Sequence, residues 1–134
     1  MPITYALEPD LAAPEFRAVL IACSLGKRRP VDDLPRLQRM LRQADVIATA
    51  RDGQRLVGIS RAVTDFSYCC YLADLAVDEA YQRQGIGKRL IAETHAAAGR
   101  ATSLILVAAP EAESYYPRIG MQQRPSCWML PRES

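Results

Sequence analysis

Apolar and polar positions alternate with strand and helix periods in the first third of the chain. Residues 3–7 form a short β-prone run closed by Glu8-Pro9-Asp10, which predicts a strand. Residues 14–23 have helical spacing with proline in the first turn, and a second helical pattern runs from Leu34 to Leu41 behind Asp32 or Asp33 as its cap. The pattern predicts a strand and two amphipathic helices, joined by the basic, breaker-rich loop 26–30.

The middle of the chain has the pattern of an antiparallel meander. Residues 46–50 and 56–63 are apolar segments, and Asp52-Gly53 between them marks a hairpin turn. Residues 68–77 are again rich in β-formers and follow a short connector. We therefore expect three consecutive strands in one sheet.

A strand, loop and helix unit follows the meander. From Gly85 the pattern turns helical, with a stripe at Ile86, Leu90, Ile91 and Thr94 and a stop signal at Gly99. Residues 103–108 are continuously apolar, which predicts a strand buried on both faces and parallel to its neighbour.

The C-terminal part predicts one more helix and one more extended segment. Residues 111–118 fit a short helix broken near Pro117, and residues 121–130 an extended segment interrupted by Pro125. The complete order predicts an α/β (mixed α+β) fold. Its sheet is mixed and mostly antiparallel with one parallel βαβ unit, and helices cover both faces. At 134 residues, we expect a single domain over 1–134.

Composition and charge narrow the classes of function. The chain is 49% hydrophobic and 24% charged, which is typical of a soluble folded domain. A net charge of +2 and a pI of about 8.4 are too mild to suggest nucleic-acid binding. The apolar runs are too short for a membrane span, and the start of the sequence lacks a signal-peptide pattern. We expect a cytoplasmic protein with no membrane or nucleic-acid partner.

Four cysteines have neither CxxC spacing nor a secretion context, namely Cys23, Cys69, Cys70 and Cys127. That usage argues against a disulfide framework or a zinc site, so no metal is expected. The sequence predicts four buried, reduced thiols.

The loop between the predicted strand that ends at Val77 and the helix that begins near Gly85 has the composition of an anion site. Gly85 and Gly87 let backbone N–H groups approach an anion closely, and the helix start adds unpaired donors and the positive end of its dipole. Arg83, Lys88 and Arg89 add positive charge. Taken alone, the pattern also fits a tight βα turn.

Two other phosphate-binding motifs do not fit this loop. A dinucleotide-binding Rossmann unit needs three glycines on the first βα turn and an acidic residue about 20 positions later. A P-loop needs four residues between its glycines and then Lys-Ser or Lys-Thr, whereas Gly87-Lys88-Arg89 has arginine there.

The same stretch resembles the signature of the GCN5-related N-acetyltransferase (GNAT) family. Gln82-Arg83-Gln84-Gly85-Ile86-Gly87 matches the family pattern of Gln or Arg, two residues, Gly, one residue, and Gly or Ala. A second family element is met by Ala112, Tyr115-Tyr116, Gly120 and Met121. One departure is Ala109, where the family often has an Asn that bonds the pantetheine arm, so cofactor affinity would be lower.

The resemblance implies acetyl-CoA as co-substrate, direct acetyl transfer to an amine in a ternary complex, and a role for each matched residue. The backbone of Leu75, Ala76 and Val77 would pair with pantetheine. Tyr116 would protonate the departing thiolate. The pyrophosphate would lie on Gln82, Arg83, Gln84, Gly85, Ile86, Gly87 and Lys88.

The general base and the acceptor stay open. Asp74 on the central strand, Asp65 before it, or relayed water could take the proton from the ammonium, and Asp74 could equally form a salt bridge with Arg61. The run Lys27-Arg28-Arg29 could contact an acidic amine, the adenosine phosphate or neither. The acceptor is a small-molecule or protein amine.

Two other functions fit the same residues. One is a non-catalytic acyl-CoA-binding module that regulates a partner protein, and the other is an unrelated nucleotide-binding protein. A homodimer is also possible through an exposed final strand in residues 121–130.

Overall fold

The computed structural model describes residues 2–133, and a five-stranded sheet forms its centre. The strands lie in sequence order in the sheet. They are β1 (Ile3–Leu7), β2 (Val46–Asp52), β3 (Arg55–Thr64), β4 (Cys69–Val77) and β5 (Ser103–Ile105). The first three pairings are antiparallel and β4 pairs with β5 in parallel. The predicted mixed fold class is confirmed.

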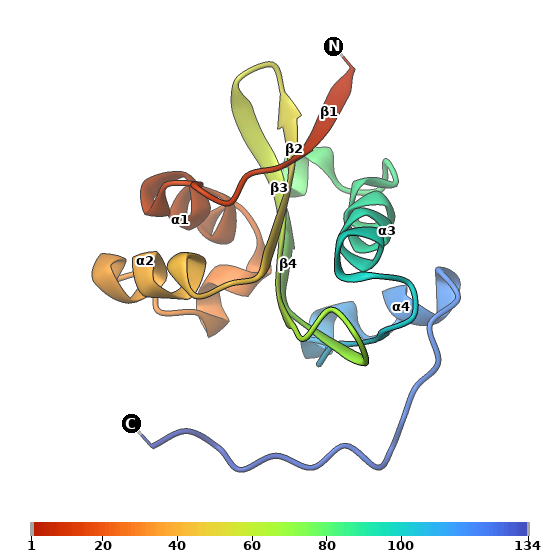
Figure 1. The fold of residues 1–134 in the computed structure, drawn as a ribbon. Coiled ribbons are helices and arrows are strands. Elements are labelled where there is room, and N and C mark those ends of the chain that lie inside the picture. The colour runs from red at the N-terminus through yellow and green to blue at the C-terminus, as the bar shows by residue number, and fades with distance from the viewer. Residues whose placement is uncertain (1, 134) are drawn as a thin grey trace.

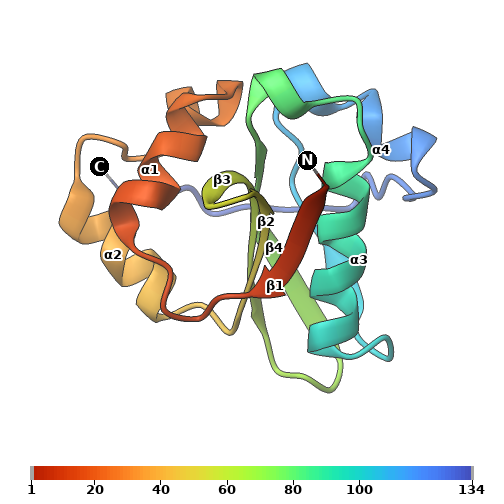
Figure 2. The same cartoon turned by 90° about the horizontal axis from the view of Figure 1, so that it is seen from above.

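Helices cover both faces of this sheet, as Figures 1 and 2 show. Helices α1 (Ala13–Ile21) and α2 (Leu34–Arg42) lie on one face, and α3 (Ile86–Ala98) lies on the other. The first layer buries Phe16, Leu20 and Leu37 against Ile59. The second layer packs Ile86 and Leu90 against alanine and valine side chains of β2 and β3. The small side chains on the α3 face let this helix approach the sheet closely.

The predicted start and stop signals are present where the helices and the hairpin need them. The Asp33 carboxylate accepts from the N–H of Arg36 at 3.1 Å and caps α2. Gly99 ends α3 at a φ of 103°, and Gly53 turns the β2–β3 hairpin at a φ of 62°. A side chain would strain either position.

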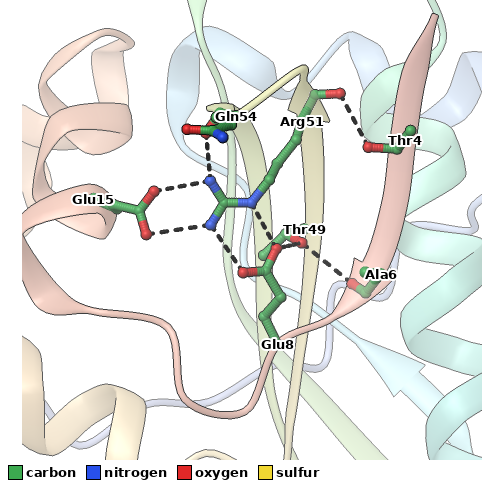
Figure 3. Close-up of polar contacts among 7 residues, drawn as sticks. All are labelled: Thr4, Ala6, Glu8, Glu15, Thr49, Arg51 and Gln54. Carbon is green, nitrogen blue, oxygen red and sulfur yellow. Dashed lines mark hydrogen bonds and ion pairs between the residues drawn. The ribbon is translucent and has the colours of Figure 1, made fainter.

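An arginine network fixes β1 and α1 to β2 (Figure 3). All five N–H donors of Arg51 are used: two go to Glu8, two to Glu15 and one to the carbonyl of Gln54, at 2.7–3.2 Å. Hydrogen bonding to Glu8 is the main reason that the pKa of Arg51 rises, and the same bond lowers the pKa of Glu8. The network connects the segment before α1 to the second strand.

The basic segment 26–30 was predicted as a loop, and that is wrong for most of it. A 3₁₀ helix, η1, spans Ser24–Arg28. Gly26 allows it to pack under α1, because a Cβ there would lie 2.6 Å from the carbonyl oxygen of Leu20. Glycine is common in loops, which is why the sequence suggested one. Here it is needed because η1 and α1 pack closely.

Strand β5 is shorter and more exposed than predicted. Only Ser103–Ile105 pairs with β4, and Ser103 and Ile105 are exposed. The expected burial on both faces is wrong, since β5 is an edge strand and the chain leaves the sheet at Leu106. The parallel direction is confirmed. An apolar run cannot distinguish a core strand from one beside a cavity.

The predicted helix over 111–118 is present as two short pieces, η3 (Pro110–Ala112) and α4 (Tyr115–Arg118). The break precedes Tyr115, and Pro117 lies within α4. A proline in the first turn of a helix removes an N–H that has no intrahelical partner there. The expected break at Pro117 is therefore wrong.

Residues 121–130 run as an extended segment outside the sheet, along the bottom of Figure 1. The segment forms no strand in the described chain. Trp128, Met129 and Leu130 are 92%, 68% and 97% exposed.

The cysteine prediction is half right. Cys23, Cys69, Cys70 and Cys127 are all free, but only Cys23 and Cys70 are buried. Cys69 begins β4 on the outward side and Cys127 lies in the exposed C-terminal segment, so both are exposed. Within residues 2–133, every helix is too short or too polar to cross a membrane.

Candidate active site

A bulge in β4 lies where this strand separates from β5. Asp74 pairs with Arg61 and Leu72 with Ala62, so Ala73 has no opposite residue on β3. Beyond Tyr71, β4 also loses its pairing with β5, which ends at Ile105. Bulges bend strands and are frequent beside active sites. The two parallel strands therefore diverge from Leu72 onward.

A cavity of about 120 Å³ lies in this divergence. Leu75 and Val77 of β4 form one wall, Leu106 and Val107 after β5 form another, and Tyr116 of α4 closes it. Cavities that enclose drug-sized ligands are about 300–1,000 Å³. This one has room for a small reacting group, with any larger ligand extending out of it.

The open edge of β4 presents main-chain groups toward the cavity. The carbonyl of Ala73 accepts from Arg29 at 2.8 Å and that of Val77 accepts from the Gln82 amide at 2.9 Å. Because alternate residues of a strand face the same edge, the peptide groups of Leu75 face this edge too. An extended ligand could add here as a strand would.

The turn after β4 is held from two sides. Asp78 accepts from the N–H of Ala80 at 2.9 Å and from Arg55 at 2.8 Å. The Tyr81 hydroxyl donates to Asp52 at 2.7 Å, which connects the turn to the tip of the β2–β3 hairpin. Residues 82–85 then run exposed to the start of α3.

The start of α3 has the geometry of an anion site. Arg83 and Gly85 have positive φ values of 65° and 81°. The helical bonding begins with the N–H of Arg89, which donates to Gly85 at 3.1 Å. The N–H groups of Ile86, Gly87 and Lys88 therefore precede the ladder. Their place at the positive end of a thirteen-residue helix favours a bound anion, and the Tyr115 hydroxyl lies beside them.

Two of the three basic side chains in this loop are available to such an anion. Arg83 and Lys88 are exposed. Arg89 is engaged elsewhere, because its guanidinium lies 4.4 Å from the centroid of the Tyr5 ring and pairs with Glu93 at 3.3 Å. Arg89 therefore points away from the anion site that the sequence expected it to support.

The tyrosine pair of α4 spans the two parts of the site. Tyr116 lines the cavity, whereas the hydroxyl of Tyr115 lies 2.8 Å from the position that a Cβ on Gly87 would take. Their rings meet edge to face with centroids 5.2 Å apart. Burial raises the pKa of both phenols, so Tyr116 keeps its proton at neutral pH.

Asp74 lies fully buried between two arginines. One carboxylate oxygen accepts from Nε of Arg29 and the other from Nε of Arg61. The salt bridge with Arg61 that the sequence suggested is confirmed, and Arg29 is an additional partner. Both oxygens are occupied, which favours a positioning role over proton transfer.

Asp65 caps the β3–β4 turn instead of facing the cavity. It accepts from the N–H groups of Tyr68, Ser67 and Cys69 at 2.8–3.1 Å, and these bonds lower its pKa to about 2. A group that holds its proton so weakly is a poor general base at neutral pH.

Two site features escaped the sequence reasoning. The basic run suggested that residues 27–29 lie near a substrate, but it did not show that Arg29 reaches Asp74 and the cavity wall. The apolar sequence of β4 gave no signal of the bulge at Ala73.

Ala109, where the family often has Asn, does line the cavity. No group of three metal-ligating side chains occurs among residues 2–133.

The comparisons with known proteins agree on one family. The family model described as an acetyltransferase (GNAT) domain matches residues 43–122. Among curated proteins, none matches the sequence.

Solved structures share the fold at low identity. A GNAT family acetyltransferase of Streptococcus pneumoniae is 22% identical with a TM-score of 0.76, covering 98% of this chain and 100% of its own. The structure of AAC(6')-Iy with a bisubstrate analogue, CoA-S-monomethyl-acetylneamine, is 14% identical with a TM-score of 0.74, covering 100% of both chains. A ribosomal-protein-alanine N-acetyltransferase of Brucella melitensis is 19% identical with a TM-score of 0.72, covering 98% of this chain and 100% of its own.

Proposed function

Because the chain belongs to the GNAT acetyltransferase family, we propose that it transfers the acetyl group of acetyl-CoA to a primary amine. The acceptor is a small molecule or a protein, and the transfer is direct, within a ternary complex. The single observation that carries the proposal is the cavity where β4 and β5 diverge. Tyr116 lines this cavity, and so does Gln82 in the turn that leads from β4 to the start of α3.

The residues present fit a CoA thioester. The N–H groups at the start of α3, with Arg83 and Lys88, suit a diphosphate. Gly87 lets the Tyr115 hydroxyl lie close to this helix start, since a Cβ there would lie 2.8 Å from that oxygen. The segment Leu75, Ala76 and Val77, in which the peptide groups of Leu75 face the free edge of β4, suits the amides of a pantetheine arm. We assign Gln82, Gln84, Gly85 and Ile86 to the diphosphate loop as well.

In the proposed reaction the neutral amine attacks the thioester carbonyl carbon, the new C–N bond forms and the C–S bond breaks. A backbone N–H of β4 stabilises the oxyanion that develops. Tyr116 donates its proton to the departing sulfur, a role that its burial suits because the phenol stays protonated. The acceptor ammonium loses one proton to water before it attacks, since both oxygens of Asp74 are bound by arginines. After the C–N bond forms, the nitrogen loses its second proton to water, and Tyr116 regains a proton from water.

Thiol release from acetyl-CoA, measured against a panel of primary amines, tests this function. We expect amine-dependent release in the wild type. Tyr116→Phe should lower kcat by about 10²–10⁴-fold with little change in acetyl-CoA affinity, the range for a lost general acid. Tyr68→Phe removes the hydroxyl of an exposed tyrosine and serves as the matched control. Full activity in Tyr116→Phe would exclude its role as acid.

One observation favours the alternative of a non-catalytic acyl-CoA-binding module that controls a partner protein. Among the described residues that line the cavity, none is a carboxylate that could act as base. Acetyl-CoA binding without acetylation of any amine, together with acyl-CoA-dependent association with a partner, would support this function over the enzyme.

We also propose a homodimer through the C-terminal segment. The exposed edge of β5 carries Ile105, and residues 121–130 expose Trp128, Met129 and Leu130. Pairing this segment with β5 of a second copy would bury both and close a symmetric dimer. Light scattering should give twice the monomer mass, which Trp128→Ser should reduce and Ile21→Ser, on exposed α1, should leave unchanged. A monomeric wild type would exclude the proposal.

A further inference from the structure

The cavity wall has a single charged side chain among the described residues, and that side chain is positive. Its side chains are mostly apolar, with neutral polar groups such as Ser24, Gln82 and Tyr116. Among the described residues that line it, Arg29 is the one with a charged side chain. No carboxylate is among the described residues that line it, and Asp74 beside Arg29 lies behind the wall.

Arg29 keeps hydrogen-bonding capacity on its terminal nitrogens. Its Nε donates to Asp74, one terminal nitrogen to the carbonyl of Arg28 and the other to the carbonyl of Ala73, the last two at 2.8 Å. A guanidinium has five N–H donors, so three are used and one remains on each terminal nitrogen. Arg51 in the N-terminal network, by contrast, uses all five.

The charge around Arg29 is not neutralised by its own partners. Asp74 is shared between Arg29 and Arg61, which leaves one net positive charge on the three side chains. The Arg29 side chain is 24% exposed, and Arg29 is one of the residues that line the cavity. Lys27 and Arg28, both exposed on η1, add positive charge to the same loop. A partly buried cation of this kind attracts an anion.

From this geometry we infer that the acceptor is a small amine that also carries a carboxylate, and that Arg29 binds this carboxylate. The inference rests on the proposed function and names its substrate class. Two N–H groups in a planar fork suit a carboxylate. A polycationic amine would meet the repulsion of η1 and find no anionic group in the described wall.

Arg29 would assist the chemistry as well as the recognition. A positive charge near the acceptor disfavours its ammonium form and lowers the pKa of that amine. The acceptor would therefore lose its proton to water more readily in the cavity. This effect suits a wall in which no described residue offers a free carboxylate as base.

The decisive experiment compares acceptors that differ only in this group. Alanine and alaninamide have the same amine and carbon skeleton, and the second has no negative charge. We expect the wild type to prefer the acid, and Arg29→Gln to lower kcat/KM for the acid by roughly 10- to 100-fold, the size of a lost hydrogen bond to a charged group. The loss should fall mainly on KM. The value for the amide should fall much less, because the amide loses only the effect of Arg29 on the amine pKa.

Arg61→Gln is the matched control, because Arg61 is the other partner of Asp74 and does not line the cavity. It should keep the preference for the acid over the amide even if its stability falls. Arg29→Lys, which keeps the charge without the planar fork, should restore part of the preference. Equal kcat/KM for acid and amide in the wild type, or a preference that survives in Arg29→Gln, would overturn the inference.

A binding measurement separates this inference from the proposed function. If no amine releases thiol, the proposed function fails, and the carboxylate site is then tested with N-acetylalanine and N-acetylalaninamide by calorimetry in the presence of CoA. Tighter binding of the acid that disappears in Arg29→Gln supports the site. Equal binding of the two compounds overturns it.

Discussion

Replacing Asp74 by Asn tests the buried ion network at the centre of the site. The carboxylate is fully buried, while its partners Arg61 and Arg29 are 12% and 24% exposed. The substitution keeps the size of the side chain and removes its charge. Two guanidiniums then share one neutral oxygen, so their charges are no longer balanced in a largely desolvated place.

The expected loss of stability is about 3 kcal/mol. Breaking a buried pair by removing one partner costs about 3–5 kcal/mol, and the partial exposure of both arginines places this case near the lower limit. With an unfolding entropy of about 2.1 cal/mol/K per residue, the melting temperature should fall by about 10 °C. A domain of this size should still fold, since total stabilities are about 5–15 kcal/mol.

Urea denaturation followed by circular dichroism measures this loss, with an unchanged m-value as the sign that the folded and unfolded states keep their compactness. Asp32→Asn is the control, because Asp32 is exposed on the neighbouring loop and should change stability by less than about 0.5 kcal/mol. If Asp74→Asn matches this control, the network does not hold the site together.

The same variant distinguishes the two roles of Asp74. A general base would give the wild type an acidic limb in kcat/KM that Asp74→Asn removes. A positioning residue would leave the shape of the pH profile unchanged and reduce activity at every pH. We expect the second result because Arg29 and Arg61 occupy both oxygens.

Three further predictions concern other parts of the molecule. Hydrogen bonding to Arg51 lowers the pKa of Glu8 below its ordinary 4.5, so this stabilisation is present above that pH and is lost as the pH falls through the lowered pKa. Glu8→Gln should therefore cost about 1–2 kcal/mol at neutral pH, and urea denaturation should show the two proteins converging as the pH falls through the lowered pKa of Glu8; a pH-independent difference would contradict this. Gly26→Ala should cost about 2 kcal/mol by thermal denaturation, since its Cβ would lie 2.6 Å from the Leu20 carbonyl, and an unchanged melting temperature would refute this packing. The defect of Tyr116→Phe should persist up to about pH 10, because burial raises the pKa of the phenol, whereas a defect that fades at lower pH would assign the titration to another group.

The sequence predicted the elements whose signals are local. The Asp33 cap, the Gly53 turn and the Gly99 stop each depend on the chemistry of one residue and its neighbours, and all three were found. The two motifs likewise carried the family, since the glycine loop and the tyrosine pair occur in short fixed patterns. The order of elements then followed from their periodicity.

Features that depend on distant contacts were missed. The exposure of β5 follows from the absence of a second neighbour in the described sheet, which an apolar run cannot reveal. Gly26 and its neighbours were predicted as a loop, yet Gly26 allows the helix η1 to approach α1. Arg29 reaches Asp74 across 45 positions of sequence, and only the folded chain brings the two together.

The central claim is that the glycine loop at the start of α3 holds acetyl-CoA, and calorimetric titration of acetyl-CoA into Gly87→Val tests it most directly. The Cβ of the valine would lie 2.8 Å from the Tyr115 hydroxyl, so the side chain would displace either Tyr115 or the helix start. Ala92→Val places the same side chain on an exposed position of the same helix and is the control. We expect saturable binding in the wild type and in Ala92→Val. Affinity in Gly87→Val should fall by at least about 100-fold, the value of two charge-assisted hydrogen bonds. Equal affinity in all three proteins would contradict the placement of the cofactor.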